Sequence, residues 1–209
     1  MRLYDYAASG NCLKVRLLLR LLDVECERVP TDIFGGDTLT EEYGRRNPVR
    51  ETPVLELDDG TAIAQSPAIL WYLAEGTSWL PDDRLGRALV AQWLAFEQEW
   101  TMRGVASARF RLITGRPGGE ERVPMARRAM ALLDDALSSR DWLVGARPSI
   151  ADLANYAYAS RSDEARVPLA EHPHVAAWIA RLRAHPGFVD DLAPYPRNAQ
   201  AGASRSIYD

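Results

Sequence analysis

Residues 47–73 read NPVRETPVLELDDGTAIAQSPAILWYL and contain the clearest succession of structural signals in the chain. Pro53 to Leu57 is typical of a strand, and Thr61 to Ala64 is typical of the strand that returns beside it. Asp58-Asp59-Gly60 lies between them and predicts a hairpin turn, because an Asp-Gly pair tolerates the positive φ of such turns. Ser66-Pro67 then predicts a helix, with the serine as N-cap and the proline at the first helical position.

The sequence before residue 47 alternates in type. Arg2 to Tyr6 and Glu25 to Pro30 are typical of strands, and the dense Leu/Val run from Leu13 to Leu22 is long enough for a helix. Asp32 to Arg46 predicts a loop with a weak helix. Together with the ββα unit that follows, this order predicts an α/β domain over residues 1–80, with a mixed four-stranded sheet (βαβ-α-ββα) and helices packed on it.

The remainder of the chain is predicted to be an all-α domain over residues 86–209. The expected helices are Leu85–Thr114, Val123–Leu137, a third that ends at Tyr158, and Pro173–His185. The third opens with Ser149-Ile150-Ala151-Asp152, which has the form of a capping box: the serine and the acid each satisfy an orphan amide. Pro194 to Asp209 is rich in Ala, Gly and Ser and predicts a loosely held tail.

The composition is that of an ordinary globular protein. The 209 residues are 47% hydrophobic and 26% charged, with a formal net charge of −4. A mildly acidic chain is a poor partner for nucleic acid, because neutralising phosphates requires clustered Lys and Arg. No uncharged run approaches the roughly 18 residues of a membrane span, and the first residues do not resemble a signal peptide. Cys12 and Cys26 are too few for a disulfide framework. We therefore predict a cytoplasmic protein with no nucleic-acid and no membrane partner.

Three segments carry a shared pattern: Ser9 to Leu17, Asn47 to Leu55 continued by Gln65 to Leu73, and Trp142 to Leu153. In this order they resemble the catalytic loop and first helix, the glutathione-binding core and the second-domain capping motif of the cytosolic glutathione transferase superfamily, in its bacterial serine-type (theta/zeta/nu-like) form. The resemblance implies a thioredoxin-like first domain, an all-α second domain and a homodimer. It also implies a detoxification enzyme that conjugates glutathione, its co-substrate, to a small electrophile or runs a related glutathione-dependent reaction.

The resemblance implies which residues bind the carboxylate and the amine at the γ-glutamyl end of glutathione. Ser66 matches the position that holds the γ-glutamyl carboxylate, and the free N–H groups and positive dipole of a helix N-terminus suit an anion. Gln65 would face the γ-glutamyl amine, where many relatives carry Glu. A glutamine supplies no charge, so another acid would have to help, such as Glu97 or Glu99 of the partner subunit in a dimer.

Pro53 matches the cis-proline of the family, and Thr52 and Val54 on either side of it are then glutathione-binding residues. The backbone of Thr52 would pair with the tripeptide as though extending the sheet.

The chain departs from the family pattern just before this proline. Relatives usually have Gly at Arg50, Lys or Gln at Glu51 and Val at Thr52. Glu51 would repel the glycyl carboxylate of glutathione if its side chain pointed inward. Arg50, which we include among the glutathione-binding residues, could supply the opposite charge together with Arg45 and Arg46, or all three could be solvated surface residues.

The thiol of glutathione needs a hydrogen-bond donor, because a hydroxyl or amide aimed at sulfur favours the thiolate. Ser9 sits where serine-type enzymes place that hydroxyl, and Asn11 is the alternative catalytic residue, since an amide N–H can do the same. Cys12 could instead form a mixed disulfide, as in glutaredoxin-like relatives, although the motif is not CxxC. An interaction module of the same fold without catalytic activity is a further alternative.

The acceptor-substrate pocket is the least determined part of the site. By analogy with the family, Arg103 and Ser107 would face it. The Trp93/Phe96/Trp100 stripe before them is more typical of a core. The three histidines are too few for a metal site, so no metal is expected.

Overall fold

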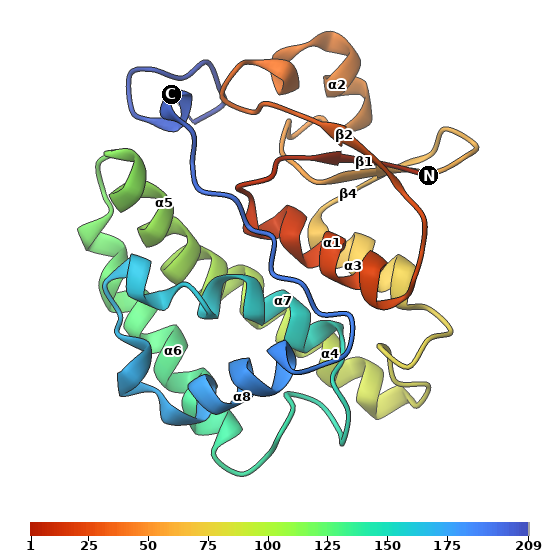
Figure 1. The fold of residues 1–209 in the computed structure, drawn as a ribbon, viewed down its shortest axis with the longest axis vertical. Coiled ribbons are helices and arrows are strands. Elements are labelled where there is room, and N and C mark those ends of the chain that lie inside the picture. Colours follow the sequence, from red (N-terminus) through yellow and green to blue (C-terminus); the bar gives the residue numbers. More distant parts are fainter. Residues whose placement is uncertain (209) are drawn as a thin grey trace. The chain divides into compact units, whose positions relative to one another are not determined.

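The computed structural model describes residues 1–208. They divide into two compact units, which are described separately here. The first comprises Met1–Leu73 together with the described residues from Val189 onward, and the second comprises Ala74–Phe188. In Figure 1 the first unit is drawn in red, orange and the darkest blue. No helix among the described residues is long and apolar enough to cross a membrane.

The first unit contains the predicted mixed sheet of four strands: β1 (Arg2–Asp5), β2 (Glu27–Pro30), β3 (Val54–Glu56) and β4 (Ala62–Ala64). Their order is β2-β1-β3-β4, with β2 parallel to β1 and the other two pairings antiparallel. The parallel pair requires a crossover, and α1 (Gly10–Leu21) provides it. The predicted turn at residues 58–60 joins β3 to β4, with Leu55 opposite Ile63.

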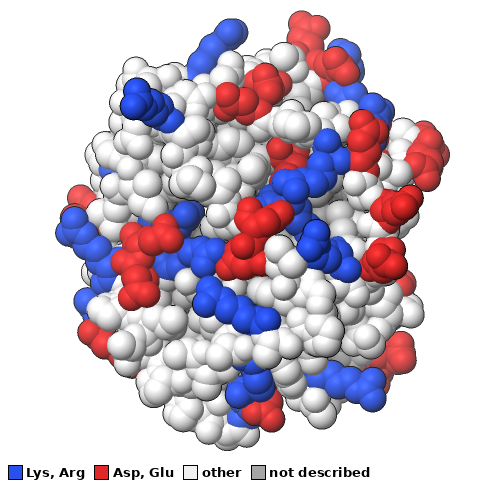
Figure 2. Space-filling model, in the orientation of Figure 1, with Lys and Arg blue, Asp and Glu red and all other residues white. Residues whose placement is uncertain are grey.

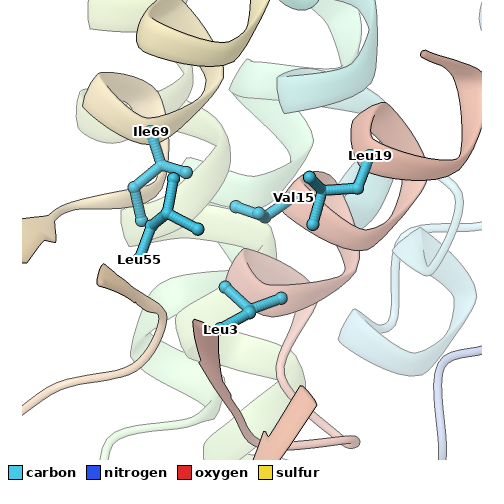
Figure 3. Close-up of a cluster of buried hydrophobic side chains, with 5 residues drawn as sticks. All are labelled: Leu3, Val15, Leu19, Leu55 and Ile69. Atoms are coloured by element: carbon cyan, nitrogen blue, oxygen red, sulfur yellow. The ribbon is translucent and has the colours of Figure 1, made fainter. Parts of the chain in front are cut away.

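Helices cover both faces of this sheet (Figure 1). On one face α1 and α3 (Ser66–Ala74) enclose a cluster of five buried aliphatic side chains. Each side chain of this size contributes roughly 1.5–3 kcal/mol to stability when it is fully buried. On the other face α2 (Glu41–Arg46), which follows the short helix η1 (Asp37–Leu39), packs its Tyr43 against the sheet. Figure 3 shows the first cluster converging between sheet and helices: Leu3, Val15, Leu19, Leu55 and Ile69.

The second unit is helical, as predicted. Its elements are α4 (Arg84–Phe96), η2 (Glu97–Ala106), α5 (Ser107–Thr114), η3 (Glu120–Arg122), α6 (Val123–Leu137), α7 (Ile150–Ala159), η4 (Ser162–Ala165), η5 (Leu169–Glu171) and α8 (Pro173–Arg183).

The predicted helix from Leu85 to Thr114 is one continuous helical run, but its middle, η2, is a π-helix. Three of the buried positions in η2 are Glu97, Thr101 and Val105, which recur every four residues. An α-helix and a π-helix both bring such positions onto one face, so the pattern did not distinguish them.

The capping box at the start of α7 is confirmed. The Asp152 carboxylate is fully buried and accepts hydrogen bonds from the backbone N–H groups of Ser149 (2.9 Å) and Leu143 (3.0 Å). It also accepts from the Trp178 indole of α8 at 2.9 Å. A motif that caps one helix therefore also joins that helix to a loop and to a second helix.

The predicted loosely held tail is wrong for the described residues. Its backbone is held within the first unit by Arg205 N, which donates to Phe34 O at 2.8 Å, and Ala193 N, just before the predicted tail, donates to Ala7 O at 3.1 Å. A short helix, η6 (Arg197–Ala199), lies between these contacts. Small residues do not prevent such packing, because most of these bonds use backbone groups. The predicted helical domain over residues 86–209 includes the tail, whereas the described part of the tail belongs to the unit that contains the sheet.

Ion pairs also anchor the start of this segment. Asp191 accepts from Arg16 at 2.8 Å, and Arg16 in turn donates to the buried Asp5 of β1 at 2.6 Å. Ion pairs also occur elsewhere among the described residues, and Figure 2 shows basic and acidic side chains interspersed over one face.

Candidate active site

The loop between β1 and α1 places Ser9 at the N-terminus of α1. Its backbone is extended (φ −83°, ψ 123°) and its Oγ accepts from the Cys12 N–H at 3.3 Å, so Ser9 is the N-cap of the helix. A hydroxyl that accepts from an amide can still donate its own proton. Ser9 is only partly buried. It therefore presents a donor at the positive end of a helix, where an anion is favoured.

Cys12 lies directly behind Ser9 and is fully buried. Burial raises the pKa of its thiol to about 12, although the Ser9 and Thr52 side chains and the Tyr6 N–H act to lower it. A thiol with this pKa stays protonated at neutral pH, and the thiolate is the nucleophilic form. The hypothesis of a disulfide reductase that uses Cys12 is therefore not supported. The sulfur instead accepts from the Tyr6 N–H at 3.4 Å and so links α1 to the end of β1.

Asn11 connects this loop to the start of α3. Its Oδ1 accepts from the Ser66 hydroxyl at 3.4 Å and from the Lys14 ammonium at 2.8 Å. Lys14 is fully buried, and the sequence analysis did not identify it. The available signal was a lysine within the apolar Leu13–Leu22 run. Its ammonium group and the Ser66 hydroxyl donate to the same Asn11 oxygen, so a positive charge lies near the first residue of α3.

The start of α3 differs from the prediction by one residue. Ile69 N donates to Gln65 O at 3.1 Å, which makes Gln65 the N-cap, and Ser66 is the first helical residue. Gln65 has a left-handed φ of 71°. Ala64 is still paired with β3, so the chain turns sharply at Gln65 and begins the helix there. Ser66 is 3% exposed, and its N–H is one of the first-turn amides that have no acceptor within the helix.

The Thr52–Pro53 peptide bond is cis, as predicted. Thr52, Pro53 and Val54 are all buried, and Val54 pairs with Ala64 of β4. The Thr52 side chain acts to lower the pKa of the Cys12 thiol, which indicates that this segment approaches the Ser9 loop. The structure thus brings together three predicted parts of the site that lie far apart in the sequence.

Arg50 occupies the position where relatives usually have Gly, and its φ is 61°, in the left-handed region that favours glycine. Its guanidinium donates to the carbonyls of Thr38 and Thr40, both at 2.8 Å. The Arg50 guanidinium, which was predicted to bind glutathione, is therefore held by these two carbonyl oxygens. The Arg46 guanidinium is also paired, with the Glu56 carboxylate at 2.7 Å.

Glu51 is partly buried just before the cis-proline. Its carbonyl accepts from the Tyr43 hydroxyl at 2.9 Å and from Asn47 Nδ2 at 2.8 Å, which fixes its backbone. Burial raises the pKa of its carboxyl group, and the Gln65 side chain opposes that rise only in part. From the sequence alone, Glu51 was expected to repel the glycyl carboxylate of glutathione if its side chain pointed inward.

Comparison with known proteins identifies the family. The glutathione S-transferase N-terminal domain matches residues 8–75 and the C-terminal domain matches residues 115–186. A glutathione S-transferase from Pseudomonas fluorescens Pf-5 is 39% identical, over 92% of this chain and 98% of its own, with a TM-score of 0.88. The chain belongs to the glutathione S-transferase family.

Two further relatives agree. A glutathione S-transferase structure from Xanthobacter autotrophicus Py2 is 37% identical, over 90% of this chain and 95% of its own, with a TM-score of 0.85. Glutathione S-transferase D6 of Drosophila melanogaster is 29% identical over 199 residues, which is 92% of each chain. The site residues above lie within the part of the chain that matches the N-terminal domain.

The tail of the chain reaches the same unit. The Tyr208 ring lies 6.1 Å from the Phe34 ring, which also packs edge-on against Tyr6. Tyr208 remains 41% exposed, so this ring contact leaves part of its side chain in solvent.

The remaining predicted site residues belong to the helical unit. Arg103 is exposed and pairs with Glu99 at 3.0 Å, while Ser107 begins α5 and is partly buried. Their role in an acceptor pocket stays a prediction. Within residues 1–208 no group of three or more His, Cys, Asp or Glu side chains could hold a metal ion.

Proposed function

We propose that this chain is a serine-type glutathione transferase of the bacterial subclass, which joins the sulfur of glutathione to a small electrophile and acts as a cytoplasmic homodimer. The observation that best supports this is the convergence of three loops at one place. Ser66 donates to Asn11, Cys12 donates to Ser9, and the Thr52 side chain is near enough to the Cys12 thiol to act on its pKa. Together these loops present a hydroxyl donor, a helix N-terminus and a buried strand start, which are the features that the thiol tripeptide requires.

Glutathione would be held by its polar ends. The Ser66 hydroxyl and N–H, with the dipole of α3, receive the γ-glutamyl carboxylate. Gln65 faces the γ-glutamyl amine. The backbone of Thr52, beside Pro53 and Val54, pairs with the tripeptide as an additional strand.

The reaction then depends on the sulfur. A free thiol has a pKa of about 8.5, so only a few per cent is ionised at pH 7. The Ser9 hydroxyl donates to the sulfur and favours the thiolate, and the thiol proton leaves to solvent. The thiolate electron pair forms a carbon–sulfur bond with the electrophile, and the leaving group departs with the electrons of the broken bond. Arg103 and Ser107 are the proposed residues of the acceptor pocket.

Ser9 is a better candidate for the donor than Asn11. The Asn11 carbonyl oxygen accepts from both Lys14 and Ser66, so this side chain links α1 to α3. We therefore assign Asn11 a positioning role for the carboxylate end.

The test is the absorbance of bound glutathione thiolate against pH. Ser9→Ala should raise the pKa of the bound thiol, with each unit equal to about 1.4 kcal/mol, and should lower turnover at neutral pH. Raising the pH should partly restore turnover, because more thiolate then forms without the donor. Asn11→Ala should weaken binding without this pH rescue. If the unmodified protein holds no thiolate at any pH below 8, the transferase mechanism is wrong and a non-catalytic glutathione-binding module is favoured.

A further inference from the structure

The first unit contains a cavity of about 400 Å³ against its C-terminal segment, which is residues 189–208. The other walls are the turn that follows β1 and the end of β2 with the loop after it. The volume lies within the range of small-molecule sites, roughly 300–1,000 Å³. None of the described residues that line it is a proposed glutathione-binding residue. Its apolar walls are formed by Ala7, Ala8, Pro30, Ala193, Pro194 and Pro196.

The wall formed by the C-terminal segment is fixed by polar contacts. Ala193 N donates to Ala7 O at 3.1 Å, and Asp191 accepts from Arg16 at 2.8 Å. Arg16 is buried and also pairs with the buried Asp5 at 2.6 Å. The cavity therefore has a defined shape before any ligand binds, and such pre-organisation lowers the cost of binding.

The charged side chains that line the cavity are engaged by other groups of the chain. Asp5 accepts from Arg28 Nε at 2.9 Å. The two Asp32 carboxylate oxygens accept from Phe34 N at 3.0 Å and from Asn198 Nδ2 at 2.8 Å. Binding an ion here would bury a second charge beside these pairs without a new partner for it. The cavity is therefore suited to a neutral molecule.

The Tyr6 hydroxyl is the polar group of the lining that has no partner. Tyr6 is 7% exposed, and its hydroxyl forms no hydrogen bond within residues 1–208. Thr31, the other hydroxyl in the lining, donates to Val29 O at 3.1 Å. Burial raises the pKa of the Tyr6 phenol, so it keeps its proton and can donate. Because a buried polar group is normally hydrogen-bonded, this donor indicates a ligand that carries an acceptor.

We propose that this cavity binds a neutral aromatic molecule with a carbonyl or similar oxygen, which accepts a hydrogen bond from the Tyr6 hydroxyl. The rings of Pro30, Pro194 and Pro196 provide flat apolar surfaces for the aromatic part. The described lining contains no thiol, amine or imidazole, so the ligand is bound rather than converted. This site goes beyond the proposed transfer of glutathione and does not depend on it.

The experiment uses the neutral dye prodan, a naphthalene with one ketone, whose fluorescence rises and shifts to the blue in an apolar site. The control ligand is the same naphthalene without the ketone. Tyr6→Phe removes the hydroxyl and keeps the ring. It should weaken prodan binding about three- to tenfold, because one neutral hydrogen bond is lost. Binding of the control ligand should be unchanged, and the variant should melt no lower than the unmodified protein.

A second variant tests the location without altering Tyr6. Ala193→Leu adds volume to the wall of the cavity and should weaken both ligands by about the same factor. Ala201→Leu is the matched control, because Ala201 is exposed in the same segment and does not line the cavity. It should leave both affinities unchanged.

Four outcomes would overturn the proposal. Equal prodan affinity in Tyr6→Phe would show that the hydroxyl does not face the ligand, and equal affinity in Ala193→Leu would place the dye elsewhere. Prodan that competes with chlorodinitrobenzene during glutathione conjugation would belong to the acceptor pocket. Absence of prodan binding to the unmodified protein at micromolar concentration would leave no site. A protein that binds prodan as expected but conjugates no glutathione would instead contradict only the proposed function.

Discussion

Replacing Ser66 by alanine should separate ligand binding from helix stability. The sequence assigned this serine to the N-cap of α3, where its loss would cost about 1 kcal/mol of folding free energy. In the structure Gln65 is the cap, and the Ser66 hydroxyl makes one long hydrogen bond of 3.4 Å to Asn11. A neutral bond of this length contributes at most about 0.5 kcal/mol. We therefore expect Ser66→Ala to leave the free energy of unfolding almost unchanged.

Binding should respond much more strongly to the same change. If the Ser66 hydroxyl donates to the γ-glutamyl carboxylate, its loss removes a hydrogen bond to a charged group, worth about 1.5–3 kcal/mol. This corresponds to glutathione affinity lower by about 10- to 150-fold, since each 1.4 kcal/mol is a factor of ten. Calorimetric titration with glutathione measures the affinity, and urea denaturation measures the stability.

Ser149→Ala is the matched control, because Ser149 is the true N-cap of α7 in the helical unit. It should destabilise the protein by about 1–2 kcal/mol without altering glutathione affinity in the folded protein. The reasoning is refuted if Ser66→Ala binds glutathione as tightly as the unmodified protein. It is also refuted if the two serine variants lose equal stability, since Ser66 would then act as a cap.

Two further predictions concern the thiols and the assembly. Cys12 should resist alkylation in the native protein from pH 7 to pH 9, because its pKa of about 12 keeps it protonated and it is fully buried. Cys26, which is partly exposed, should react first, and mass spectrometry after digestion would disprove the assignment if Cys12 were labelled as fast. The proposed homodimer should scatter light at micromolar concentration as twice the 23.3 kDa chain, and a mass of one chain would contradict it.

The sequence by itself determined the elements whose signals are local. The Asp-Gly turn at residues 58–60, the capping box from Ser149 to Asp152 and the helix Val123–Leu137 all depend on backbone preferences and side-chain bonds within a few residues. The order of these elements, with the family resemblance, was enough to predict the mixed sheet and the helical domain. The resemblance, rather than any local signal, gave the cis bond before Pro53.

Only the tertiary structure determined which groups the charged side chains of the site contact. Lys14 binds Asn11 within α1, and only the packing of α1 against α3 brings the Ser66 hydroxyl to the same Asn11 oxygen. The backbone of Arg50 is left-handed, and its guanidinium donates to the Thr38 and Thr40 carbonyls, which lie 12 and 10 residues earlier in the sequence.

The tail was decided in the same way. Its composition indicates weak intrinsic order, and it is held by bonds to residues more than 150 positions earlier, including Arg205 N to Phe34 O. Sequence signals of turns and caps extend over about four residues. The direction of a charged side chain depends on partners at any sequence distance, so only the folded chain settles it.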